Sequence, residues 1–133
     1  MILITGAAGF IGSHLIKELR DDHDIRGLVH SEDDIETVEE LGAEAVVGDV
    51  TEPESLENVM DDIDIIIHLV AIIDGTPQEF QDIHVQGTQN ILDAAPDDLD
   101  QFIHFSALGA EKESTAYFTT KREAERRVKD SEL

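Results

Sequence analysis

The sequence predicts an α/β fold in which helices cover both faces of one doubly wound parallel β-sheet. Three observations indicate this class: short apolar segments alternate with amphipathic ones, a glycine-rich turn joins the first two, and residues 63–71 are almost continuously apolar. Strands that are covered on both faces carry such continuous apolar sequences. Alternating strands and helices of this length imply parallel strands joined by right-handed crossovers.

The elements follow in order along the chain. We expect strands at residues 1–5, 25–30, 43–48, 64–71 and 101–106, and helices at residues 10–21, 33–41, 53–61, 78–95 and 115–130. The helix at 78–95 has one apolar face, whose members recur at three- and four-residue steps: Phe80, Ile83, Gly87, Ile91 and Ala94. The sequence thus predicts five βα units in one Rossmann domain, residues 1–133. A complete dinucleotide fold usually has six strands, so we expect an N-terminal portion of a longer chain, without its substrate-binding part.

The most informative motif is the turn after the first strand. Gly6, Gly9 and Gly12 follow that strand at three-residue steps and lead into the first helix. In such a turn the first glycine allows a sharp bend, the second lets backbone approach a pyrophosphate, and the third lets the helix pack on the strand. The amides at the helix N-terminus then face the phosphates. The motif predicts a dinucleotide site that includes Gly6, Ala8, Gly9, Phe10, Ile11 and Gly12.

The composition is strongly acidic, with 31 acidic residues against nine lysines and arginines and a formal net charge of −22. The acids are interleaved with apolar residues, which excludes a disordered acidic segment. Repulsion between so many negative charges weakens a compact fold in dilute buffer, whereas molar salt shortens the screening length to about 3 Å. We therefore expect a halophilic protein, with an ordinary acidic mesophilic protein as the alternative. Nucleic acid is not expected as a partner, because its phosphates need a basic surface.

Other ligands and locations are limited by what the sequence lacks. It has no cysteine, which excludes disulfides and thiolate zinc sites, and its six histidines have no metal-ligand spacing, so we expect no metal. No apolar run approaches the roughly 20 residues of a membrane span. The N-terminus begins directly with a strand and shows no signal segment, so we expect a cytoplasmic protein.

Several short motifs follow one another along the chain. They are Thr5-Gly6-Ala7-Ala8-Gly9-Phe10-Ile11-Gly12, Gly48-Asp49-Val50, His68-Leu69-Val70-Ala71, Val85-Gln86-Gly87-Thr88-Gln89-Asn90 and Tyr117-x-x-x-Lys121. In this order they resemble the motifs of the extended short-chain dehydrogenases, the epimerase/dehydratase superfamily. Residues 105–110, together with Glu125 four residues after Lys121, resemble its atypical branch, which is related to the nucleotide-binding accessory subunit of respiratory complex I. The resemblance implies an NAD(P) cofactor and raises association with a respiratory or other protein complex as an expectation.

The resemblance also implies which residues contact the cofactor. Asp49 would accept a hydrogen bond from the adenine amino group, and Val50 would lie beside the adenine ring. The end of the fourth strand would line the cofactor with Leu69, Val70 and Ala71.

The choice between the two nicotinamide cofactors depends on the end of the second strand. Members that prefer NAD carry an acid where Val29 stands, and His30 occupies a position where related proteins often have an arginine for the 2′-phosphate. His30 and Ser31 would accommodate that phosphate, although Glu32 and Asp33 oppose it. NADP(H) is therefore slightly favoured over NAD(H).

The chemistry of the superfamily depends on Tyr117 and Lys121, which share one face of the last helix at positions i and i+4. The resemblance implies that the ammonium favours the phenolate, so that the phenol exchanges a proton with a substrate while hydride moves at the nicotinamide. Ser106 would orient the substrate, although a gapless comparison places Ala107 there. His84 replaces the asparagine of the family.

Three functions remain open at this point. The first is an NAD(P)-dependent oxidoreductase or epimerase/dehydratase that acts on an unknown small-molecule substrate. The second is a non-catalytic nucleotide-binding accessory or assembly protein. The third is a sensor of the redox state of the nucleotide.

Overall fold

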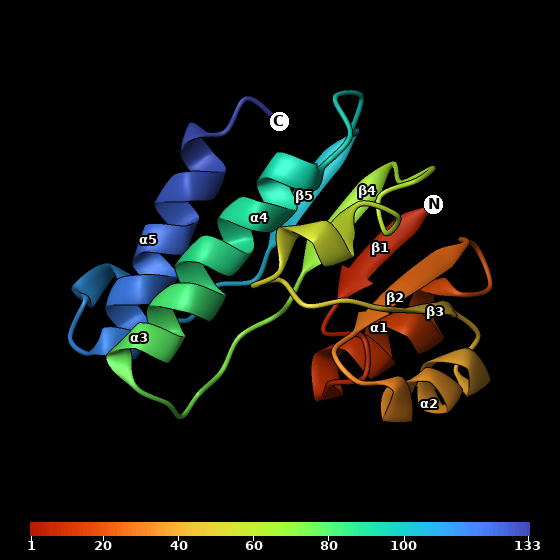
Figure 1. The fold of residues 1–133 in the computed structure, drawn as a ribbon, viewed down its shortest axis with the longest axis horizontal. Coiled ribbons are helices and arrows are strands. Elements are labelled where there is room, and N and C mark those ends of the chain that lie inside the picture. Colours follow the sequence, from red (N-terminus) through yellow and green to blue (C-terminus); the bar gives the residue numbers. More distant parts are fainter.

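Five parallel strands form one sheet in the computed structural model, which describes residues 1–133, and their order is β3-β2-β1-β4-β5 (Figure 1). The strands are β1 (Ile2–Thr5), β2 (Ile25–Val29), β3 (Glu44–Val47), β4 (Ile65–His68) and β5 (Gln101–His104). The chain starts in the centre of the sheet, builds outward to β3, and then crosses over to β4 and β5. This topology confirms the predicted fold class. Ligands bind such sheets at the carboxyl ends of the strands, where the strand order reverses, which here lies between β1 and β4.

Helices cover both faces of the sheet (Figure 1). They are α1 (Phe10–Leu19), α2 (Ile35–Glu40), α3 (Pro77–Phe80), α4 (Gly87–Ala94) and α5 (Ala116–Asp130). On one face Ile4 packs with Ile16 of α1 and Val38 of α2. On the other face Leu3 packs with Leu56 and with Ile91 of α4. Adjacent residues of the central strand therefore anchor two separate apolar cores, as expected for a strand covered on both sides. None of the helices combines the length and the apolar character needed to cross a membrane.

Two predicted helices differ from the observed elements. Residues 53–61 contain only a 3-10 turn, Pro53–Leu56, and not a full helix. Leu56, Val59 and Met60 are all buried there, so their spacing does not distinguish a helix from successive turns. The helix predicted at 78–95 is divided into α3, a π-helical segment at Gln81–Gln86, and α4. The strands predicted to end at 71 and 106 end at 68 and 104, and the remaining residues form loops at the edge of the sheet.

A buried polar chain connects the central strands to α4. The amide of Leu69 donates to Thr5 Oγ1 (3.1 Å), and Thr5 Oγ1 lies 2.8 Å from His68 Nδ1. On the other side of the ring, His68 Nε2 lies 3.1 Å from Thr88 Oγ1, which donates to the carbonyl of His84 (2.7 Å). Because Thr88 gives its only hydroxyl proton to that carbonyl, His68 Nε2 carries a proton and Nδ1 accepts from Thr5. The chain fixes a neutral His68 between β1, β4 and α4.

His104 lies beside this chain but outside its hydrogen bonds. Its ring stacks on His68 with 5.6 Å between centroids, and neither of its buried ring nitrogens has a partner. Burial lowers the pKa of His104 to about 4, with a further contribution from the charge of Lys121. Burial likewise lowers the pKa of His68 to about 3. Both rings are therefore neutral in the folded protein at neutral pH.

We predict that His104→Phe protects the fold against mild acid. An unfolded histidine binds a proton below about pH 6.5, whereas folded His104 stays neutral down to about pH 4. Its contribution to stability is therefore complete above pH 6.5 and is lost as the pH falls between these values. Urea unfolding at pH 7.5 and pH 5 should show that His104→Phe removes up to about 2 kcal/mol of the acid-induced loss. His23→Gln, at an exposed histidine, is the matched control. An unchanged loss in His104→Phe would contradict a neutral His104.

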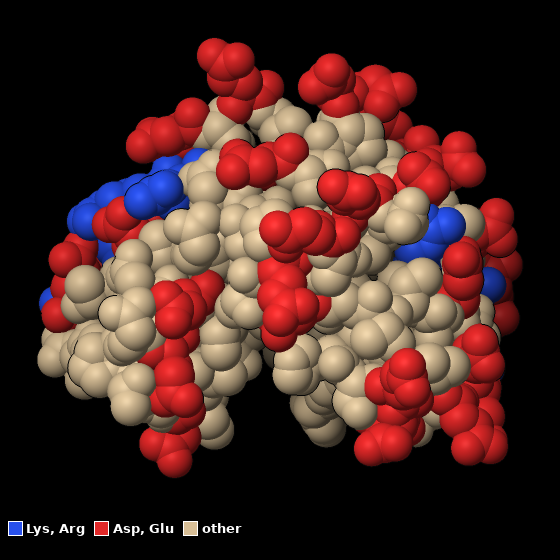
Figure 2. Space-filling view, in the orientation of Figure 1, with Lys and Arg blue, Asp and Glu red and all other residues tan.

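The surface carries far more negative than positive charge. Figure 2 shows acidic side chains spread across the face, with lysine and arginine gathered in small areas. Five of the nine basic residues belong to α5. Arg26 is buried and pairs with Glu44 (3.2 Å). Most acids consequently have no basic neighbour, and their mutual repulsion opposes folding in dilute buffer.

We predict that salt stabilises the fold. The melting temperature should rise between 0.1 M and 2 M KCl. The screening length falls to about 3 Å at molar salt, so the repulsion between surface charges becomes weak. The double substitution Asp97→Asn/Asp98→Asn removes two adjacent exposed charges. This variant should melt at a higher temperature than the natural sequence in 0.1 M KCl and should respond less to added salt. A melting temperature that does not change with salt would rule out charge repulsion as a major destabilising term.

Candidate functional site

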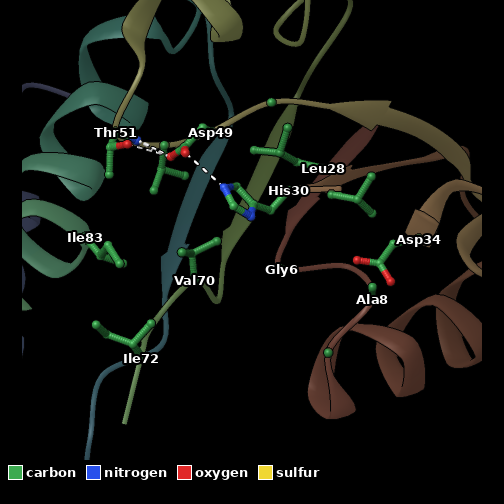
Figure 3. Close-up of a pocket in the computed structure, with 14 residues that line it drawn as sticks. Gly6, Ala8, Leu28, His30, Asp34, Asp49, Thr51, Val70, Ile72 and Ile83 are labelled. Carbon is green, nitrogen blue, oxygen red and sulfur yellow. Dashed lines mark hydrogen bonds and ion pairs between the residues drawn. The ribbon is translucent and has the colours of Figure 1, made fainter. Parts of the chain in front are cut away.

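A pocket of about 440 Å³ opens at the carboxyl ends of the central strands (Figure 3). Its volume lies within the roughly 300–1,000 Å³ of small-molecule sites. The residues that line it come from the turn after β1, the end of β2, the 3-10 turn Glu32–Asp34, the loops after β3 and β4, and the π-helical segment. They are Gly6, Ala8, Gly9, Leu28, Val29, His30, Asp34, Gly48, Asp49, Val50, Thr51, Val70, Ile72 and Ile83.

The glycine turn has the geometry of a phosphate cradle. Gly6 has a φ of +70°, a conformation that side chains other than glycine's rarely adopt. A Cβ on Gly12 would lie 2.4 Å from the carbonyl oxygen of Gly6, so α1 begins in direct contact with β1 only because this residue has no side chain. A Cβ on Gly9 would meet only that same oxygen, at 3.2 Å, and otherwise open space. Gly9 therefore faces the pocket, and Gly12 faces the protein.

The N-terminus of α1 is open to an anion. Gly9 caps the helix without a side chain, and no acid stands in the first turn. The first amides of α1 thus have no side-chain acceptor, and the helix dipole adds positive potential at the same place. These features fit the pyrophosphate of a dinucleotide.

Asp49 is held in a defined position at the opposite side of the pocket. Its Oδ1 accepts hydrogen bonds from the amide (2.8 Å) and hydroxyl (2.7 Å) of Thr51, and its Oδ2 lies 3.0 Å from His30 Nε2. Burial alone would raise the pKa of Asp49, but the bonds from Thr51 and His30 hold it below its usual value. The carboxylate is therefore ionised at neutral pH, and the imidazole of His30 is directed at Asp49 (Figure 3).

A second cluster surrounds the start of the loop after β5. Buried Lys121 of α5 donates from Nζ to the carbonyl of Phe105 (2.8 Å). Burial lowers the pKa of Lys121 to about 8, an effect that Glu125 partly opposes. Ser106 Oγ donates to Glu125 (2.6 Å), and this bond lowers the pKa of that carboxyl. Lys121 therefore remains mostly an ammonium at neutral pH.

Tyr117 lies one turn before Lys121 on α5 and packs against the π-helical segment. Its ring makes edge contacts with Phe80 (6.0 Å between centroids, 77°) and His84 (5.4 Å, 82°). Buried His84 also joins two other elements, because Nδ1 lies 2.9 Å from Thr120 Oγ1 and Nε2 lies 3.0 Å from the backbone of Ile72. Burial lowers the pKa of His84 to about 4, so the ring is neutral. His84 connects the loop after β4 to α5.

The structure places the predicted site residues in three groups. One group lines the pocket and comprises Gly6, Ala8, Gly9, His30, Asp49, Val50 and Val70. A second group does not line the pocket, but its members stand at the start of α1 or next to a lining residue in the sequence. They are Phe10, Ile11, Gly12, Ser31, Leu69 and Ala71. The third, Ser106, Tyr117 and Lys121, belongs to the cluster near α5 and does not line the pocket. The roles of all these residues stay predictions.

Sequence reasoning missed several pocket residues. Thr51 has a recognisable signal, because an Asp with a Thr two residues later is typical of a side-chain-bonded turn. Asp34 also has one, since an acid roughly 20 residues after a glycine turn often contacts the ribose. Ile72 and Ile83 carry no comparable signal and are found only from the fold. No group of three or more histidine or acidic side chains lies close enough together to hold a metal ion.

Comparison with known proteins identifies the family. The sequence profile of the NAD(P)H-binding family matches residues 6–133. The chain therefore belongs to the NAD(P)H-binding proteins of the extended and atypical short-chain dehydrogenase/reductase type, as the motifs predict.

Three relatives illustrate the range of the family. L-arabinose 1-dehydrogenase (NAD(P)(+)) of Haloferax volcanii is 30% identical over 79% of this chain and 40% of its own. The photosystem II assembly factor Ycf39 of Cyanophora paradoxa is 30% identical over 85% of this chain and 36% of its own. The structure of UDP-glucuronic acid 4-epimerase from Bacillus cereus in complex with NAD superposes with a TM-score of 0.80 and 28% identity, over 99% of this chain and 53% of that one. The chain thus spans about half or less of these proteins.

We predict that substitutions at Gly9 and Gly12 have different effects, the first on nucleotide binding and the second on stability. Gly9→Val fills the pocket side of the turn and should abolish nucleotide binding in calorimetry, with little change in far-ultraviolet circular dichroism. Gly12→Ala places a methyl group against the Gly6 carbonyl and should destabilise the fold by about 1–3 kcal/mol, measured by urea unfolding. Normal nucleotide affinity in Gly9→Val would exclude the turn as the phosphate site.

Proposed function

We propose that this protein is an NAD(P)-dependent oxidoreductase or epimerase/dehydratase that acts on a small-molecule substrate. Family membership supports the cofactor class. One observation supports catalysis: the buried ammonium of Lys121 lies one helical turn from Tyr117 on α5. Ser106 Oγ donates a hydrogen bond to Glu125, one turn further along the same helix. A nucleotide site alone has no need for these three groups.

Each residue group has a role in this mechanism. The amides at the start of α1 would bind the pyrophosphate, and Asp49 would accept a hydrogen bond from the adenine amino group, with Val50 beside the ring. Leu69, Val70 and Ala71, in the loop after β4, would line the bound cofactor. The bound cofactor supplies the site that takes up or releases hydride. On sequence grounds His30 and Ser31 favour NADP(H), while the family match supports both nicotinamide cofactors equally.

Proton transfer falls to the residues near α5. The Tyr117 phenol holds the proton that is exchanged with a substrate hydroxyl or carbonyl. The Lys121 ammonium, which is buried and keeps its charge at neutral pH, would stabilise negative charge that develops on the phenol oxygen during proton transfer. Ser106 orients the substrate oxygen once its hydroxyl turns from Glu125.

A second candidate function is a nucleotide-binding accessory or assembly protein in which the cofactor is structural. One observation favours it: the photosystem II assembly factor of Cyanophora paradoxa is among the relatives. In that case the protein would associate with a larger complex, and a nucleotide sensor would be a variant of the same role. The acidic surface supports a further proposal, a setting at high salt.

We predict that Tyr117→Phe retains nucleotide affinity and lowers turnover at least ~100-fold, because it removes the phenol and keeps the ring. Lys121→Met should lower turnover and nucleotide affinity together. Lys112→Met, at an exposed lysine, is the matched control and should change neither. Turnover is measured over a screen of carbonyl compounds and nucleotide sugars, and affinity by calorimetry.

The outcomes of this experiment separate the two functions. Full activity in Tyr117→Phe would exclude Tyr117 as the acid–base group. Tight nucleotide binding without turnover of any compound in the screen would favour the accessory protein over the enzyme.

A further inference from the structure

One hydrogen bond between side chains joins two lining residues of the pocket. The last backbone bond between the ends of β2 and β3 runs from the amide of Gly48 to the carbonyl of Val29 (3.0 Å). His30 and Asp49 follow these two residues directly, and His30 Nε2 lies 3.0 Å from Asp49 Oδ2. Both side chains line the pocket, and Figure 3 shows the imidazole directed at the carboxylate. The bond therefore occupies two polar groups that a ligand would otherwise meet.

Asp49 is the fixed member of this pair. Ser55 Oγ accepts a hydrogen bond from the amide of Asp49 (2.9 Å), which holds the backbone. Thr51 donates twice to Asp49 Oδ1, from its amide (2.8 Å) and from its hydroxyl (2.7 Å). A carboxylate oxygen offers about two acceptor sites, so Oδ1 is fully used inside the protein. Oδ2 is the oxygen that remains for a ligand, and His30 is bonded to it.

His30 is the movable member. Its side chain is 81% exposed, against 28% for Asp49. The bond to Asp49 is the one hydrogen bond that its ring makes. An exposed side chain that is held by a single bond reorients at little cost, because exposed pairs of this kind are weak. When the bond opens, we therefore expect the imidazole to move and the carboxylate to stay in place.

We infer that His30 is a gate residue, whose imidazole competes with a ligand's hydrogen-bond donor for Asp49 Oδ2, so that the pocket takes up a nucleotide only after the bond opens. This inference rests on the proposed function, in which the adenine amino group donates to Asp49. Because the imidazole itself lines the pocket, it stands where a base bonded to this oxygen would lie. The apparent affinity is reduced to the fraction of molecules in which the bond is open. An exposed pair keeps it closed in roughly 60–85% of them.

The charge of the pocket makes the opposite prediction for a change at His30. None of the lining residues is a lysine or arginine, and two of them, Asp34 and Asp49, are acids. Removal of the basic side chain makes the pocket more negative, which weakens the binding of an anionic pyrophosphate. Removal of a gate strengthens it. The direction of the change therefore separates a gate from a general electrostatic role.

Calorimetry with NAD⁺ tests the gate in the natural sequence, His30→Ala, His30→Gln and His23→Ala. NAD⁺ is the probe because it lacks the 2′-phosphate that the sequence assigns to His30. His30→Ala should bind NAD⁺ about two- to fivefold more tightly, the gain expected when an exposed pair is removed. His30→Gln should bind like the natural sequence, because its amide can still donate to Asp49. His23→Ala, at an exposed histidine outside the pocket, is the matched control and should also leave the affinity unchanged.

The possible results distinguish this inference from the function on which it rests. Unchanged or weaker binding by His30→Ala would overturn the gate and leave the nucleotide site intact. An equal gain in His30→Gln would assign the effect to loss of the ring and not of the bond, and an equal gain in His23→Ala to a general effect; either would overturn the gate as well. Binding of NAD⁺ by none of the four folded proteins would overturn the proposed nucleotide-binding function itself. Far-ultraviolet circular dichroism monitors folding.

Discussion

The site depends on the contact between α1 and β1. The backbone of Gly12 lies so close to the Gly6 carbonyl and to Ala7 that no Cβ fits between them. This contact brings the N-terminus of α1 to the carboxyl end of the central strand. Because β1 lies between β2 and β4, the turn borders both halves of the sheet. Residues from the loops after β2, β3 and β4 can therefore line one pocket.

On the other side of the sheet, buried Lys121 influences three neighbouring histidines. Burial lowers the pKa values of His68, His84 and His104, and all three rings are neutral at neutral pH. The charge of Lys121 contributes to each of these shifts, because a second cation nearby would be repelled. The negative charge of Glu125 acts in the other direction on Lys121, because it partly offsets the lowering of the Lys121 pKa by burial. In a molecule with a net charge of −22, this region is isolated from the acidic surface by burial.

Local patterns predicted most of the fold and only part of the site. The central strands and the glycine turn are encoded by neighbouring residues, as in the apolar run at 63–71. The bond between His30 and Asp49 is not local, since it forms only because β2 and β3 are adjacent. Asp34 was missed as a lining residue because its orientation depends on a 3-10 turn that apolar spacing does not reveal. The helix predicted at 53–61 was wrong for a similar reason, because its buried residues suit several conformations.

The loop after β4 joins the pocket at the carboxyl ends of the strands to the residues near α5. Ile72 lines the pocket with its side chain, while its backbone bonds His84, whose ring contacts Tyr117. A ligand that packs against Ile72 thus touches the loop that positions Tyr117 through one intervening ring. An enzyme needs this connection, because hydride and proton transfer require cofactor and phenol in fixed relation. A sensor would use the same connection to convey nucleotide occupancy to α5. The phenol hydroxyl of Tyr117 distinguishes the two, since packing requires only the ring and proton transfer requires the oxygen.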